Sequence, residues 1–252
     1  VNNIINKGGT ILKSARSKEF RTKEGRAKAY EHLKENEIEG LVVIGGDGSF
    51  TGAVIFNEEF NFPMIGIPGT IDNDIFGTSH TIGYDTALNT AVEAIDKIRR
   101  DAGFIALNAG VGAGAEEILI PEEDLGLERM LESLKKSRRT GKSSSIVVVA
   151  EGDKSGKNVY ELAQYVEENL PEYDVRVSVL GHMQRGGSPS CFDRVLASRL
   201  GVKSVELLLD GQTNLMVGLK DNEVISSSIS EAIKGGHSIN QELLRVSDIM
   251  TT

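Results

Sequence analysis

The sequence predicts an α/β fold of the doubly wound kind, in which helices cover both faces of a mostly parallel sheet. Three short runs, at 41–44, 64–67 and 146–149, are continuously apolar. Such runs are typical of parallel strands that are buried on both faces. Helical patterns lie between them, and the alternation of strands with helices favours a parallel sheet. A fourth run, 175–180, is also expected to form a strand.

The spacing of apolar residues supports each expected helix. In 86–99, apolar side chains recur every three or four residues and form one stripe, with Asp85 or Thr86 as the expected cap. The segment 127–138 shows the same pattern, and helices are also expected at 158–169, at 192–209 and after the glycine-rich turn that ends the first strand. Because no low-complexity linker is visible, two domains would be joined by crossing chain segments.

Length and composition exclude several classes of protein. The chain has 252 residues, 39% of them apolar and 26% charged, so it is neither a disordered tail nor a membrane protein. Its single cysteine, Cys191, excludes a disulfide framework and a cysteine-based zinc site. No signal peptide is visible, so a cytoplasmic location is expected. The net charge of −9 argues against nucleic-acid binding, and positive charge for an anionic ligand must be gathered locally.

Glycines and an aspartate follow the first expected strand, in the stretch Gly45-Gly46-Asp47-Gly48-Ser49. Glycines allow a tight turn and a close approach of backbone amides to a ligand, and the following helix N-terminus attracts phosphate. Asp47 could share a Mg²⁺ ion with phosphate oxygens. The simpler alternative is a structural turn with a capping aspartate.

A second polar stretch, 68–74, follows the second expected strand and contains Thr70, Asp72 and Asp74. Ligands bind at the carboxyl ends of strands in open α/β sheets. One of two carboxylates spaced i and i+2 could accept a proton while the other orients a ligand or holds a metal. An Asx-rich turn is the structural alternative. The neighbouring glycine-rich stretch favours an active site.

Positive charge gathers in two places. The stretch 180–189 combines His182 and Arg185 with several glycines and suits an anionic group, although a single histidine is more often structural. Arg16 and Arg21 lie near the start of the chain, and the adjacent arginines Arg99 and Arg100 lie at the end of an expected helix. Most charge clusters are solvated faces, but in this acidic chain these arginines are where phosphorylated ligands could be held.

Taken together, these stretches resemble the bacterial ATP-dependent 6-phosphofructokinase family, and they occur in the family's order through nearly the whole chain. The resemblance rests on Gly8-Gly9-Thr10 with Ser14-Ala15-Arg16, on 45–49, 68–74, 82–87 and 150–152, and on 181–189. It implies two Rossmann-like three-layer α/β/α domains. The first, residues 1–83 with 184–234, would bind ATP. The second, residues 84–183 with 235–252, would bind fructose 6-phosphate and an effector.

The resemblance implies transfer of the γ-phosphoryl group of Mg-ATP to the 1-hydroxyl of fructose 6-phosphate, the committed step of glycolysis. Asp72 resembles the general base, flanked by Thr70 and by Asp74, which would help with Mg²⁺ and positioning. Arg100 resembles the arginine that stabilises the transition state and contacts substrate. Glu151, His182 and Arg185 resemble further ligands of the sugar phosphate, and Arg176 resembles the arginine that reaches a neighbouring subunit's 6-phosphate.

The nucleotide site follows from the same resemblance. Asp47 resembles the carboxylate linked to Mg²⁺, and the residues expected around ATP are Arg16, Arg21, Gly46, Gly48 and Ser49. Pyrophosphate-using relatives usually carry Asp at the position of Gly48 and Lys at that of Gly69, so two glycines favour ATP. The family is a homotetramer with a nucleotide effector such as ADP, and Arg99, Glu116 and Lys142 are expected at the effector site. Thr140 and Ser144 differ from the family's usual Lys and His.

The chain also departs from the family in length. The family's first strand and a Gly-Gly-Asp loop would lie upstream of Val1, and its segment around Arg99-Arg100 is longer. The sequence is therefore expected to be part of a longer protein. A pyrophosphate-dependent enzyme, another sugar-phosphate kinase, an NAD- or lipid-kinase relative and a non-catalytic binding paralogue are the alternatives. The presence of Asp47, Asp72 and Asp74 favours catalysis.

Overall fold

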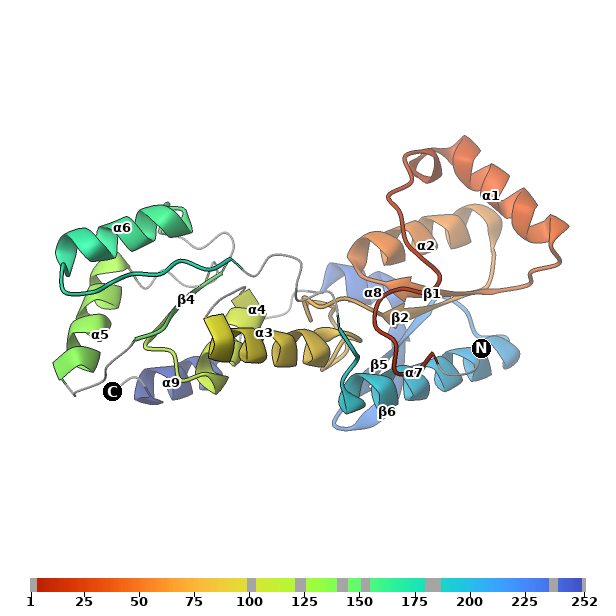
Figure 1. The fold of residues 1–252 in the computed structure, drawn as a ribbon. Coiled ribbons are helices and arrows are strands. Elements are labelled where there is room, and N and C mark those ends of the chain that lie inside the picture. Colours follow the sequence, from red (N-terminus) through yellow and green to blue (C-terminus); the bar gives the residue numbers. More distant parts are fainter. Residues whose placement is uncertain are drawn as a thin grey trace. The chain divides into compact units, whose positions relative to one another are not determined.

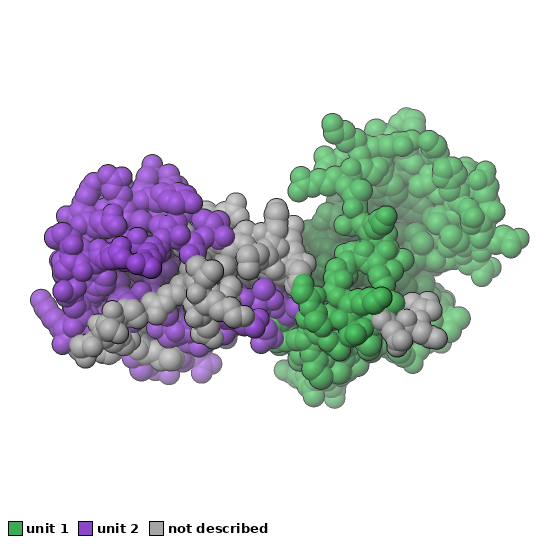
Figure 2. All heavy atoms as spheres, in the orientation of Figure 1, with its two compact units in different colours: residues 1–85, 187–237 green, residues 86–186, 238–252 purple. Residues whose placement is uncertain are grey.

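The computed structural model describes residues 4–98, 103–120, 126–139, 145–150, 155–179, 187–235 and 240–250. The chain divides into two compact units (Figure 2). Unit 1 comprises residues 1–85 and 187–237, and unit 2 comprises residues 86–186 and 238–252. Both units contain parallel strands flanked by helices, so the expected α/β class is confirmed. Within the described residues, no helix is long and apolar enough to cross a membrane.

Unit 1 is built on a four-stranded sheet in the order β1-β2-β5-β6 (Figure 1). The first three strands run parallel, and β6 pairs with β5 in the antiparallel sense. The elements of this unit are η1 (Glu19–Arg21), α1 (Lys23–Glu35), β1 (Leu41–Gly45), α2 (Asp47–Phe60), β2 (Met64–Pro68), α7 (Cys191–Leu209), β5 (Leu215–Lys220), β6 (Glu223–Ser228) and α8 (Ile229–Lys234).

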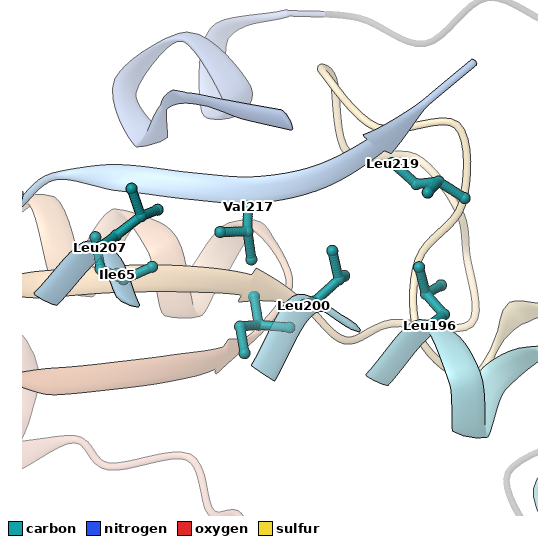
Figure 3. Close-up of a cluster of buried hydrophobic side chains, with 7 residues drawn as sticks. Ile65, Leu196, Leu200, Leu207, Val217 and Leu219 are labelled. Atoms are coloured by element: carbon teal, nitrogen blue, oxygen red, sulfur yellow. The ribbon is translucent and has the colours of Figure 1, made fainter. Parts of the chain in front are cut away.

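The core of unit 1 fills both faces of this sheet because successive strand residues point to opposite sides. Ile65 and Ile67 of β2 pack with the buried leucines of α7 on one face (Figure 3). On the other face, Met64 packs with Phe56 of α2, and Gly66 leaves room for the ring of Phe50. The result is a three-layer α/β/α arrangement in which side chains of β2 pack against helices on both faces of the sheet.

Unit 2 contains the two-stranded parallel sheet β3–β4. Leucines and valines of α5 and α6 pack against these strands and form the unit's main hydrophobic cluster. Gly110 of α4 lies so close to β3 that a Cβ there would clash with Ile118. The elements are α3 (Tyr84–Ile98, whose first two residues belong to unit 1), α4 (Gly103–Gly112), β3 (Glu117–Leu119), α5 (Leu127–Arg139), β4 (Val147–Val149), α6 (Val159–Asn169) and α9 (Gln241–Met250).

Two expectations about local structure were wrong. The described part of the run 175–180 contains no strand, and Val175 instead packs against the cluster formed by α5 and α6. Apolar alternation alone does not make a strand, because a strand also needs a neighbouring backbone to pair with. Helix α3 begins at Tyr84, so Asp85 and Thr86 both lie in its first turn rather than at the cap position.

Candidate active site at the ends of β1 and β2

The two polar loops predicted from the sequence lie side by side. Strands β1 and β2 are adjacent and parallel, and their last residues, Gly45 and Pro68, stand opposite each other. Beyond them, the amide nitrogen of Gly69 donates a hydrogen bond to the carbonyl oxygen of Gly45 at 3.0 Å. A Cβ built on Gly46 would lie 3.6 Å from the Cβ of Thr70. The glycine-rich turn and the Thr70 loop therefore form one continuous surface.

The first of these loops leads directly into the N-terminus of α2. Gly46 is the N-cap residue, and its carbonyl accepts the amide protons of Ser49 at 3.0 Å and Phe50 at 3.1 Å. The first amides of a helix have no partner within the helix and attract anions. The carboxylate of Asp47 is exposed in this first turn, and a Cβ on Gly48 would meet no atom within 4 Å. The loop thus offers free amides, a carboxylate and open space.

The second loop presents two exposed carboxylates, those of Asp72 and Asp74. The hydroxyl of Thr70 lies 3.2 Å from Asp72 Oδ2 and accepts the amide proton of Asp72 at 3.2 Å. This short turn orients the Asp72 side chain relative to the end of β2. The arrangement leaves a carboxylate in solvent, next to a hydroxyl that can donate to it, beside the helix N-terminus of α2.

Asn73 forms the base of this loop and was not singled out by the sequence analysis. It is buried, and its backbone φ is +52°, in the left-handed region that asparagine tolerates better than most residues. Its Oδ1 accepts the amide proton of Thr81 at 2.8 Å, and its Nδ2 donates to the carbonyl of Ser79 at 3.2 Å. The one signal in the sequence is an asparagine flanked by two aspartates in a loop.

The two N-terminal arginines expected near ATP, Arg16 and Arg21, both have exposed side chains. Arg21 is the last residue of η1, which is fastened to the unit through Arg26. The guanidinium of Arg26 binds both carboxylate oxygens of Glu59 at 2.7 Å and donates to the carbonyl of Phe20 at 3.1 Å. This bidentate bond lowers the pKa of the Glu59 carboxyl and raises that of Arg26.

Two further predicted site residues lie in unit 2. The carboxylate of Glu116 is buried, and it accepts hydrogen bonds from the amide of Ile146 and, at 3.4 Å, from the hydroxyl of Ser137. The Arg176 side chain is 86% exposed and pairs with Asp174 at 3.1 Å. Arg176 also lines a pocket between α5, α6 and β4 whose other walls are mostly apolar. An effector role for Glu116 and a phosphate role for Arg176 stay predictions.

The remaining predicted site residues lie outside the described residues. They are Arg99, Arg100, Lys142, Glu151, His182 and Arg185, together with the two positions Thr140 and Ser144 where the sequence departs from the family.

The donor set at the strand ends fits a magnesium ion held jointly with a phosphorylated ligand. Within the described ranges, no three histidine, cysteine or acidic side chains are grouped as a protein-only metal site. Mg²⁺ commonly keeps several waters and is bound through one or two carboxylates plus substrate phosphates. An exposed Asp47 beside the free amides of α2 provides such a carboxylate next to a phosphate position.

Comparison with known sequences gives a consistent picture. Residues 1–208 match the family described as Phosphofructokinase. The ATP-dependent 6-phosphofructokinase 1 of Thermus thermophilus is 51% identical over 266 residues, which cover 99% of this chain and 82% of the relative. The ATP-dependent 6-phosphofructokinase of Listeria monocytogenes is 49% identical over 268 residues, which cover 100% of this chain and 82% of the relative.

Solved structures share the fold. The phosphofructokinase of Pichia pastoris in the T-state superposes with a TM-score of 0.85 at 31% identity, and that of Saccharomyces cerevisiae with 0.84 at 29%. This chain spans only 32% and 38% of the length of those two yeast chains. The pyrophosphate-dependent phosphofructokinase from Marinobacter aquaeolei has a TM-score of 0.76 at 21% identity and shares the fold alone.

Proposed function

This chain belongs to the phosphofructokinase family, and from that premise we propose that it transfers the γ-phosphoryl group of ATP to the 1-hydroxyl of fructose 6-phosphate. The products are fructose 1,6-bisphosphate and ADP, and the reaction is the committed step of glycolysis. The observation that carries the proposal is the pairing of two loops at the ends of β1 and β2. This pairing sets an exposed Asp72 beside the phosphate-attracting N-terminus of α2.

Asp72 is the proposed general base. The Thr70 hydroxyl donates to one carboxylate oxygen, Oδ2, and thereby fixes the orientation of the group. The other oxygen, Oδ1, then accepts the proton as the 1-hydroxyl attacks the γ-phosphorus. A positioned base of this kind contributes roughly 10²- to 10⁴-fold to a rate. Asp74, two residues on and also exposed, adds a second carboxylate for positioning and for the metal.

The glycine-rich loop is the proposed phosphate cradle for ATP. In this proposal the amides of Asp47 and Gly48 and the side chain of Ser49 bind the phosphates, and Gly48, where a Cβ would meet no atom within 4 Å, leaves room for them. Bound Mg²⁺ supplies charge neutralisation across the transferred phosphoryl group, and Asp47 is the carboxylate that would hold it. Arg16 and Arg21 add positive charge on the nucleotide side. Phosphoryl transfer depends mainly on such positioning and charge neutralisation.

Several further residues extend the proposal by resemblance to the family. The sugar phosphate is held by Glu151, His182, Arg185 and Arg100, with Arg176 reaching a neighbouring subunit's substrate. A nucleotide effector such as ADP binds through Arg99, Glu116 and Lys142. The protein works as a cytoplasmic homotetramer, and neither a nucleic acid nor a membrane is among its partners. In this scheme unit 1 binds ATP, and unit 2 binds fructose 6-phosphate and the effector.

The donor preference follows from two glycines. A side chain at Gly48 would project into open space at the start of α2, where the nucleotide is proposed to lie. At Gly69, a Cβ would lie 2.8 Å from the Ile44 side chain, so this position is closely packed against β1. With glycine at both positions, the phosphate cradle lacks the aspartate at position 48 and the lysine at position 69 that pyrophosphate-using relatives usually carry. ATP is therefore the proposed donor.

The test is formation of fructose 1,6-bisphosphate by the purified full-length protein with fructose 6-phosphate and either Mg-ATP or Mg-pyrophosphate. Product formation with ATP and none above background with pyrophosphate supports the proposal. Product formation with pyrophosphate but not with ATP would show that pyrophosphate, and not ATP, is the phosphoryl donor. Binding of both ligands without product would indicate a non-catalytic paralogue.

A further inference from the structure

We propose that Thr81 is a positioning residue for the general base: it holds the Thr70–Asp72 turn in place through the hydrogen bond from its buried hydroxyl to the Thr70 carbonyl. This inference rests on the proposed function, because it concerns the geometry of Asp72. Thr81 lies nine residues after Asp72 in the sequence and outside every motif that the sequence analysis singled out. It is fully buried, so it acts through other groups and not by contact with substrate.

The hydroxyl of Thr81 meets the loop at two points. Its Oγ1 lies 2.6 Å from the carbonyl oxygen of Thr70 and 3.2 Å from Oδ1 of Asn73. A threonine hydroxyl has one proton to donate, and the shorter distance assigns it to the Thr70 carbonyl. Thr70 is the residue whose own hydroxyl donates to Asp72 Oδ2. A chain of two hydrogen bonds therefore runs from a buried side chain to the exposed carboxylate.

Asn73 connects the same two segments through its side-chain amide. Its Oδ1 accepts from the Thr81 amide and its Nδ2 donates to the Ser79 carbonyl, so both ends of the amide are used. This pattern fixes the amide orientation, because an oxygen must face the Thr81 N–H and a nitrogen must face the Ser79 carbonyl. Burial of Asn73 between Asp72 and Asp74 leaves the two carboxylates exposed on either side of it.

The chain segment around Thr81 is held in place by hydrogen bonds of its own, in addition to those that it makes with the Thr70–Asp72 turn. The amide of Ile82 donates to the carbonyl of Pro68 at 2.9 Å, and the amide of Gly83 donates to Oδ1 of Asp193 on α7 at 2.9 Å. Asp193 is itself buried, and its own amide is capped by Ser190. Thr81 is thus tied to the sheet and to a long helix, which gives it a fixed position from which to hold Thr70.

Loss of the Thr81 hydroxyl should therefore misplace Asp72 rather than remove it. A misplacement of about 1 Å in a catalytic group costs on the order of 10²-fold in rate. Thr81→Val has nearly the same shape as threonine but lacks the hydroxyl, whereas Thr81→Ser retains it. We expect kcat for fructose 1,6-bisphosphate formation to fall roughly 10- to 100-fold in Thr81→Val, with KM for ATP unchanged. In Thr81→Ser, kcat should stay near that of the unmodified protein.

A matched control separates positioning from loss of stability. Thr78 is also buried, three residues before Thr81. Its hydroxyl accepts a hydrogen bond from the Leu219 amide at 3.0 Å and donates one to the His80 carbonyl at 2.8 Å, and so does not hold Thr70. Thr78→Val thus removes an equivalent buried hydroxyl. We expect it to lower the thermal unfolding midpoint about as much as Thr81→Val while leaving kcat much closer to normal. Equal loss of kcat in both variants would overturn the proposal.

The decisive measurement is a double-mutant cycle with Asp72→Ser in the full-length protein. If Thr81 acts through Asp72, adding Thr81→Val to Asp72→Ser should cause no further loss of kcat. Independent, multiplying losses would show that Thr81 does not act through the base. An unchanged kcat in Asp72→Ser alone would instead overturn the proposed function. If Thr81→Val fails to fold, Thr81→Ala, which also removes the hydroxyl, replaces it with the same expected loss.

Discussion

The amide nitrogen of Gly69 donates a hydrogen bond to the carbonyl oxygen of Gly45 at 3.0 Å, one step beyond the last paired residues of β1 and β2. This bond continues the backbone pairing of β1 and β2 past the ends of the strands. It therefore fixes the glycine-rich turn at 45–49 relative to the loop at 69–74. The position of Asp47 relative to Asp72 is thereby set by backbone pairing. A rigid sheet edge of this kind suits a reaction that depends on placing two phosphorylated ligands in line.

Gly48→Asp should weaken ATP binding without destabilising the fold. A Cβ at this position meets no protein atom within 4 Å, and an aspartate in the first helical turn is favourable to the helix dipole. The added carboxylate would face the phosphates, and a like-charge repulsion of about 1.4 kcal/mol already corresponds to a tenfold change, so KM for ATP should rise by roughly tenfold or more. Gly48→Ala is the control, with a much smaller rise. Unchanged KM in Gly48→Asp would place ATP elsewhere.

Glu59→Gln should change how stability depends on pH. The bidentate bond to Arg26 lowers the pKa of the Glu59 carboxyl. Its contribution to folding stability is therefore present above the unfolded pKa and is lost as pH falls through the lower folded value. Denaturant titrations at about pH 7 should show Glu59→Gln to be less stable than the unmodified protein, and the difference should shrink below about pH 4.

The exposed pair Lys28–Glu19 provides the control for this titration. Its side chains are 62% and 65% exposed, and surface pairs contribute little to stability. Glu19→Gln should leave the unfolding free energy almost unchanged at both pH values. A difference between Glu59→Gln and the unmodified protein that grows as pH falls would contradict the assigned role of the Arg26–Glu59 pair.

Leu200→Ala should destabilise unit 1 by about 2–5 kcal/mol, since Leu200 is fully buried between α7 and the sheet (Figure 3). Leu209, on the same helix, is 82% exposed, and Leu209→Ala should change stability by less than about 0.5 kcal/mol. Chemical denaturation of the two variants tests this difference. Equal effects would mean that the α7 face packed on the sheet has been misassigned.

Elements with strong local patterns could be predicted from the sequence. Strands β1, β2 and β4 are apolar throughout, and α3, α5, α6 and α7 lie within two residues of their expected bounds. Strand β3 was missed because it begins with Glu117, directly after Glu116. Both side chains are buried through hydrogen bonds, among them one from Ser133 to Glu117 at 2.7 Å. Sequence patterns do not reveal such bonds, since the partner residues lie in other parts of the chain.

The candidate site shows the same division. The exposed residues Asp47 and Asp72 could be found because glycine and aspartate follow apolar runs. The supporting residues Asn73 and Thr81 could not, because their role depends on how the chain returns from Ser79 to the end of β2. Likewise, the Arg26–Glu59 pair joins α1 to α2 across 33 residues. Long-range pairing of polar groups is decided by the path of the chain and not by local spacing.

The central claim, that Asp72 abstracts the proton from the 1-hydroxyl, is tested most directly by steady-state kinetics of Asp72→Ser in the full-length protein. Removal of a general base should lower kcat for fructose 1,6-bisphosphate formation by roughly 10²- to 10⁴-fold, while KM for fructose 6-phosphate and for ATP changes little. A kcat near that of the unmodified protein, with the same product formed from ATP, would contradict the account.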